Sequence, residues 1–182
     1  MSRGIMSGAL CLSVILLWSL IGFSEQASTL LSEPSGGFKY TIPEGWTTAE
    51  FPGVKFKISR GVPSSGFAPN IAIVDEAYDG TVEDYLAACL GLMEKGIQGF
   101  KVLEKMPFNT DSGIKGIKLV FESKPDGKQL MQTQYYFKGI KGKMLLITCS
   151  VLSEDRPKFA DMFDTAMKTF QIINTPEGKP AN

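Results

Sequence analysis

The sequence contains no histidine among its 182 residues. Histidine is the usual general base near neutral pH and the commonest metal ligand in proteins. Its absence excludes Ser-His-Asp and Cys-His catalysis and histidine-ligated zinc within this chain. Chemistry that depends on carboxylates, on lysine or on a bound cofactor stays open.

An excess of charge of either sign is also lacking, since the chain has 19 Lys and Arg residues and 19 Asp and Glu residues. No global electric field therefore favours nucleic acid or an anionic membrane as a partner. Hydrophobic residues make up 43% of the chain, which is an ordinary proportion for a globular protein. The length allows one domain with a buried core.

The apolar run over residues 9–21 is shorter than the ~20 residues that a membrane-spanning helix needs. A basic residue precedes it and small residues follow it, which is the pattern of a signal peptide over residues 1–27. We predict cleavage after Ser24 or Ala27 and export to the periplasm or the extracellular space. An uncleaved N-terminal anchor is the alternative. Residues 28–36 are small and polar and are interpreted as a linker.

Cysteine is scarce, with Cys11, Cys89 and Cys149 as the only three. Cys11 lies inside the apolar run, too early for a lipidation site. Cys89 and Cys149 could form a disulfide in an oxidising compartment. We favour two buried free thiols, because cysteine is among the most often buried residues.

Hydrophobic periodicity predicts a single α+β domain over residues 37–173, with a mostly antiparallel sheet packed between helices. Thr81 has the character of an N-cap at the start of the first predicted helix, which ends near Gly96, and a second helix begins at Ser153. Residues 174–182 are predicted to be a disordered tail. The predicted strands cover residues 38–42, 54–58, 70–74, 101–107, 117–122, 129–137 and 143–152.

Five acidic residues cluster around the start of the first predicted helix: Asp75, Glu76, Asp79, Glu83 and Asp84. They could form a calcium or magnesium site, since these cations prefer several oxygen ligands. Their spacing does not fit the known calcium-binding loop. We therefore favour capping of the helix and complementation of its dipole.

Two short motifs match only part of a known pattern, one of a catalytic nucleophile and one of a phosphate-binding loop. Ser112-Gly-Ile-Lys115 has the Ser-x-x-Lys spacing of penicillin-binding enzymes, but the partner motifs are absent and a turn before a strand is favoured. Gly61 to Gly66 lacks the Gly-Lys-Ser/Thr ending of a phosphate-binding loop and is interpreted as a flexible loop that could contact a partner.

The aromatic residues Tyr135, Tyr136 and Phe137 stand together on a predicted strand. Aromatic strands can stack nucleic-acid bases, but no basic patch accompanies these residues, so core packing is favoured. Trp46 is likewise expected to be a core residue rather than an exposed platform.

Several segments together resemble the DcrB and PsbP-like superfamily. The resemblance covers roughly residues 36–173, and its motifs are mostly structural. Its segments are Gly37-Phe-Lys-Tyr-Thr-Ile-Pro-Glu-Gly-Trp46, Asn70-Ile-Ala-Ile-Val74 before a Thr-Val-Glu-Asp-Tyr helix, Gln132-Thr-Gln-Tyr-Tyr-Phe137, Leu146-Ile-Thr-Cys149 and the stretch from Phe163 to Phe170.

This resemblance implies a curved sheet between helices and a non-catalytic accessory or binding domain. It assigns no catalytic, cofactor-binding or metal-binding residue and no cofactor. We expect an exported accessory protein, not an enzyme, that contacts an unknown protein partner at the membrane periphery and could associate peripherally with the membrane. The alternatives are a photosystem-associated PsbP-like subunit, which the missing histidines disfavour, and a small hydrolase or ligand-binding protein that uses carboxylates and lysine. Cytosolic chaperone and nuclear Ran-binding branches are disfavoured by the leader.

Overall fold

The computed structural model describes residues 29–173. The predicted signal peptide and the predicted C-terminal tail lie outside the described residues. Within residues 29–173, no helix is both long and apolar enough to span a bilayer.

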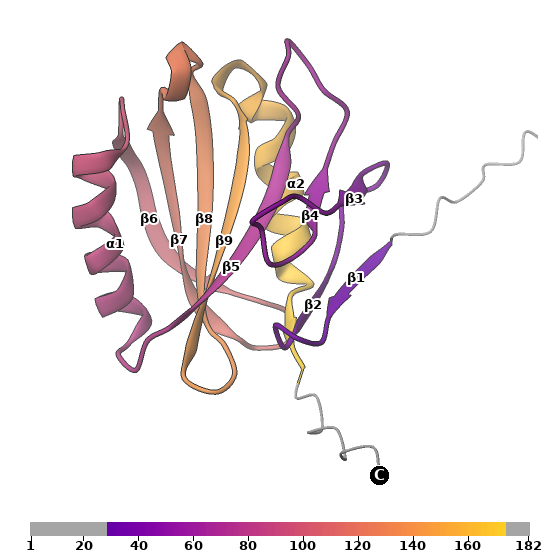
Figure 1. The fold of residues 1–182 in the computed structure, drawn as a ribbon, viewed down its shortest axis with the longest axis vertical. Coiled ribbons are helices and arrows are strands. Elements are labelled where there is room, and N and C mark those ends of the chain that lie inside the picture. The colour runs from indigo at the N-terminus through magenta and orange to yellow at the C-terminus, as the bar shows by residue number, and fades with distance from the viewer. Residues whose placement is uncertain (1–28, 174–182) are drawn as a thin grey trace, which may run out of the picture.

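A seven-stranded sheet, antiparallel at every pairing, forms the centre of the domain (Figure 1). Its middle is the meander predicted from the sequence, in which tight turns join consecutive strands. In spatial order, the strands are β3 (Thr47–Ala49), β4 (Ile58–Arg60), β5 (Asn70–Ala77), β9 (Lys143–Leu152), β8 (Leu130–Lys138), β7 (Lys115–Ser123) and β6 (Lys101–Asn109).

Helix α1 (Val82–Gly96) covers one face of this sheet and helix α2 (Arg156–Lys168) lies on the other (Figure 1). A second sheet of three short strands lies on the α2 side. Its strands are β1 (Leu30–Glu33), β2 (Phe38–Thr41) and β10 (Gln171–Ile172), with β2 in the middle. Two single-turn 3₁₀ helices, Pro125–Gly127 and Ser153–Asp155, complete the described elements.

The two cores follow from the two-residue period of the strands, because successive side chains point to opposite faces of a sheet. In β9, Leu145, Ile147 and Cys149 belong to the larger core under α2, whereas Met144 belongs to the smaller core under α1. The β2–β3 region closes the larger core, where Trp46 packs edge-on against Phe163 at a centroid distance of 6.1 Å.

Stacked rings join the small sheet to the large one. The Phe170 ring, just after α2, stacks on Phe38 of β2 at 5.6 Å and on Phe137 of β8 at 5.2 Å. All three side chains are fully buried. Large aromatic side chains contribute most to core burial, so this stack fixes the small sheet to the rest of the domain.

Two sequence predictions differ from the structure. The alternating segment 54–58 is mostly a loop, with only Ile58 in a strand. Its side chains do not share one buried face, since Val54 is exposed and Phe56 packs in the core beside Phe38. The stretch interpreted as a linker contains β1, which pairs with β2 and buries Leu31.

The short strands β3 and β10 were not predicted. The other predicted strands and the two predicted helices agree with the structure to within a few residues. Thr81 caps α1 as expected, since its hydroxyl accepts a hydrogen bond from the Asp84 amide at 3.1 Å. Trp46, Tyr135, Tyr136 and Phe137 are buried core residues, which confirms the interpretation of the aromatic strand.

Candidate functional site

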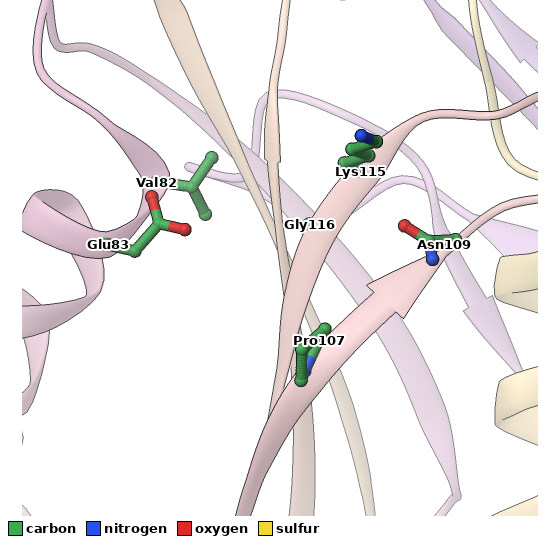
Figure 2. Close-up of a pocket in the computed structure, with 6 residues that line it drawn as sticks. All are labelled: Val82, Glu83, Pro107, Asn109, Lys115 and Gly116. Atoms are coloured by element: carbon green, nitrogen blue, oxygen red, sulfur yellow. The ribbon is translucent and has the colours of Figure 1, made fainter.

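A pocket of about 460 Å³ opens between the start of α1 and the ends of β6 and β7. Figure 2 shows Val82 and Glu83 on the helix side and Pro107, Asn109 and Lys115 on the strand side. The capping box at Thr81 fixes where α1 begins and so places Glu83 beside the opening. Because β6 is the edge strand of the sheet, this pocket is open to solvent on its outer side.

The chemistry of this pocket is limited. Glu83 is its only carboxylate and Lys115 its only cation, and both side chains are exposed. Paired-carboxylate hydrolysis needs two acidic groups flanking the bond to be broken. Of the other three pockets described within residues 29–173, two contain one carboxylate each and the third contains none. The expected hydrolase alternative therefore lacks its carboxylate pair at these pockets.

An apolar groove lies between the end of β2 and α2. We call it the α2 groove, and its volume is about 320 Å³. The Thr41 amide donates a hydrogen bond to the Thr169 hydroxyl at 2.8 Å, which holds the two walls together. The groove is lined by Thr41, Ile42, Pro43, Glu44, Met162, Thr165, Ala166 and Thr169. Its only charged lining residue is Glu44, so a ligand there would be held mainly by apolar contact.

The five acidic residues around the start of α1 take separate roles. Asp84 completes the capping box with Thr81, which confirms the predicted capping role for this residue. Glu76 accepts a hydrogen bond from the Tyr85 hydroxyl at 2.7 Å, and Asp75 bonds to two lysines. Within residues 29–173, no three His, Cys, Asp or Glu side chains gather closely enough to hold a metal ion.

Asp75 has a perturbed acid strength. Burial by itself would raise the pKa of this carboxyl, but hydrogen bonds and charge from Lys143 and Lys55 outweigh that effect and lower it below its ordinary value. Asp75 is therefore a carboxylate in the folded protein.

The Ser112–Lys115 motif lies in the turn between β6 and β7, as expected. The Ser112 hydroxyl donates to the Phe170 carbonyl at 3.0 Å and bonds to the Thr110 hydroxyl. Ser112 therefore joins this turn to the end of α2, while Lys115 lies at the pocket of Figure 2. In the Gly61–Gly66 loop, the Gly66 carbonyl accepts a hydrogen bond from Lys128.

A polar cluster under α2 was not predicted from the sequence. Asp164 of α2 accepts hydrogen bonds from the Tyr135 hydroxyl at 2.5 Å and from the Lys118 ammonium at 2.7 Å. Burial raises the pKa of Tyr135, so its hydroxyl stays protonated and donates. The only signal in the sequence was the position of Lys118 next to the apolar Ile117. Neighbouring residues of a strand point to opposite faces, so Lys118 lies on the α2 face.

The two cysteines of the domain are free and lie on opposite faces of the sheet. Cys149 is in the core under α2, and Cys89 is on α1 and packs against the other core. Burial raises the pKa of both thiols. Both thiols are free, as favoured, but only Cys149 is buried, whereas Cys89 is half-buried.

These features define a class: a single α+β domain of the PsbP-like fold, in which most buried polar side chains are engaged in holding the structure together. The chain belongs to the DcrB family, whose model, described as DcrB, matches residues 41–169. No curated protein matches the chain.

Solved structures share this fold at low sequence identity. A protein of unknown function from Pseudomonas aeruginosa, PA94, described as a regulator, is 24% identical, with a TM-score of 0.57 over 82% of this chain and 98% of that one. The cyanobacterial PsbP of Synechocystis is 14% identical, with a TM-score of 0.56 over 86% and 98%.

LpqN of Mycobacterium tuberculosis, described as involved in cell envelope biogenesis, is 13% identical, with a TM-score of 0.59 over 83% of this chain and 88% of that one. At these identities the similarity shows the fold alone. It confirms the expected fold class, whereas the expected family resemblance is confirmed by the DcrB family match.

Proposed function

We propose that this protein is an exported, non-catalytic accessory protein that acts by binding another protein at the membrane periphery. Membership of the DcrB family supports this role, and the descriptions of PA94 as a regulator and of LpqN as involved in cell envelope biogenesis are compatible with it. The signal-peptide pattern predicted over residues 1–27 supports export.

The observation that carries the proposal is the α2 groove. Its surface is mostly apolar, and two of its lining residues, Ile42 and Ala166, belong to the buried core. Protein interfaces are built around apolar side chains that fill such hollows. No side chain lining this groove is a nucleophile activated by a base, so the groove is suited to binding rather than to a reaction.

The test is affinity purification of the tagged protein from the envelope fraction of its native cells, with partners identified by mass spectrometry. The informative variant is Thr165→Arg, which places a long charged side chain at an exposed position on the groove wall and leaves the core intact. The matched control is Ala88→Arg, at an exposed position of α1 on the opposite face of the sheet.

We expect one stable partner to be recovered with the unchanged protein and with Ala88→Arg, and to be lost with Thr165→Arg. Recovery of the same partner with Thr165→Arg would remove the α2 groove from the interface. Recovery of no partner from the envelope, together with hydrolytic activity of the purified protein, would contradict the accessory role.

A further inference from the structure

Two lysines share one carboxylate near the end of β5. The Asp75 carboxylate accepts hydrogen bonds from Lys55, in the loop before β4, and from Lys143, the first residue of β9. Both ammonium nitrogens lie 2.6 Å from the same oxygen, Oδ2. The two nitrogens are therefore close to each other, at no more than twice that distance.

The three side chains differ in their exposure. The Asp75 side chain is only 5% exposed, whereas those of Lys55 and Lys143 are 49% and 35% exposed. The carboxylate is thus the covered part of the cluster, and the ammonium groups form its outer part. Each ammonium has three N–H donors, so donors that Asp75 does not use remain at the surface.

The charges in this cluster do not balance. One carboxylate faces two ammonium groups, which leaves one positive charge in excess and two like charges that repel each other at short range. Lys55 is further held over the Phe56 ring, with its nitrogen 4.8 Å from the ring centroid, so it is not free to turn away completely. A second anion that bridges the two ammonium groups would offset this repulsion.

We propose that Lys55 and Lys143, held by Asp75, form a binding site for a small oxyanion of the phosphate class. Lysine binds phosphate as a compact point charge, and two lysines this close can contact two oxygens of one phosphate group. The phosphate can be free in solution or part of a lipid headgroup. This site is separate from the α2 groove and does not depend on the proposed accessory role.

The test is a titration of the purified protein with sodium phosphate, followed by the backbone amide signals of Phe56, Asp75 and Lys143 in NMR spectra. Sodium chloride at equal ionic strength is the reference. The informative variant is Lys143→Met, which retains the Lys55–Asp75 pair. The matched control is Lys128→Met, an exposed lysine at the opposite end of β8 from the turn that leads to Lys143.

We expect saturable changes of these signals with phosphate in the unchanged protein and in Lys128→Met, and affinity weaker by about tenfold or more in Lys143→Met. Lys55→Met serves as a second variant if Lys143→Met does not fold, as judged by circular dichroism. Absence of a saturable change, or equal changes in Lys143→Met and Lys128→Met, would overturn the proposal.

A second arm identifies the source of the phosphate. Co-sedimentation compares vesicles of phosphatidylcholine with vesicles that also contain phosphatidic acid. Selective sedimentation with phosphatidic acid that is lost in Lys143→Met supports a lipid headgroup. Phosphate binding without such sedimentation supports a soluble phosphate compound. Both results support the site, and neither bears on the partner sought through the α2 groove.

Discussion

At the scale of single residues, Asp164 joins the two polar groups that face α2. Its carboxylate satisfies both the Tyr135 hydroxyl and the Lys118 ammonium, and the Lys118 side chain is only 11% exposed. A nearly buried ammonium that loses its partner is destabilising, because its charge remains out of water without compensation. The Asp164 side chain is itself 38% exposed, so solvent screens part of this effect.

Replacement of Asp164 by Asn should therefore lower the free energy of unfolding by about 1–3 kcal/mol. The measurement is equilibrium unfolding in urea. The control is Asp161→Asn, an exposed position one turn earlier on α2, which should change stability by less than about 0.5 kcal/mol. Equal losses in the two variants would mean that the Lys118 contact contributes no net stability.

At the scale of elements, the strands that pair in sequence order were the easiest to predict. Glycine-containing turns join β7 to β8 and β8 to β9, and the two-residue period sets which side chains face which core. Segment 54–58 has the same alternation but is mostly a loop. The alternating pattern alone does not show whether a neighbouring strand is available for pairing. Strand β4 pairs with β3 from Ile58 onward and with β5 at Ser59 and Arg60, and neither pairing includes residues 54–57.

The candidate sites were harder to predict than the strands. The α2 groove combines Ile42 with Ala166, and the oxyanion site combines Lys55 with Lys143. Such pairs are far apart in the sequence and meet only through the order of the strands. Sequence periodicity identifies which face a side chain occupies but not which distant side chain shares that position.

Two glycines in neighbouring elements should respond in opposite directions to alanine. A Cβ atom at Gly116 of β7 would collide with the Tyr136 carbonyl and the Phe137 ring, whereas a Cβ atom at Gly91 of α1 meets nothing within 4 Å. Gly116→Ala should cost about 1–3 kcal/mol through overpacking. Gly91→Ala should stabilise by about 0.5–1 kcal/mol, because glycine is a poor residue inside a helix.

Thermal or urea unfolding of the two variants checks this contrast. A destabilised Gly91→Ala protein would indicate that the exposed face of α1 is covered in solution. An unchanged Gly116→Ala protein would mean that β7 and β8 can separate slightly without loss of stability.

At the scale of the whole molecule, the central sheet separates the two cysteines of the domain. Because Cys89 and Cys149 belong to cores on opposite faces, no disulfide can join them without disrupting the sheet. We therefore expect the melting temperature of a protein that comprises residues 29–173 to be the same with and without a reducing agent. Thiol titration of the unfolded protein should find both cysteines reactive. A lower melting temperature after reduction would contradict this arrangement.

The pairing of β5 with β9 also determines when the domain can fold. Eight residue pairs join Asn70–Ala77 to the segment that begins at Lys143, and Phe38 of β2 pairs with Ile172 of β10. Strand β5 therefore lacks its β9 partner until residue 152 has been synthesised, and β2 lacks its β10 partner until residue 172. Contacts between such distant segments slow folding. We therefore expect the domain to complete its fold only after its C-terminal strands have been made, and an incompletely folded chain is the form that can pass through a narrow channel.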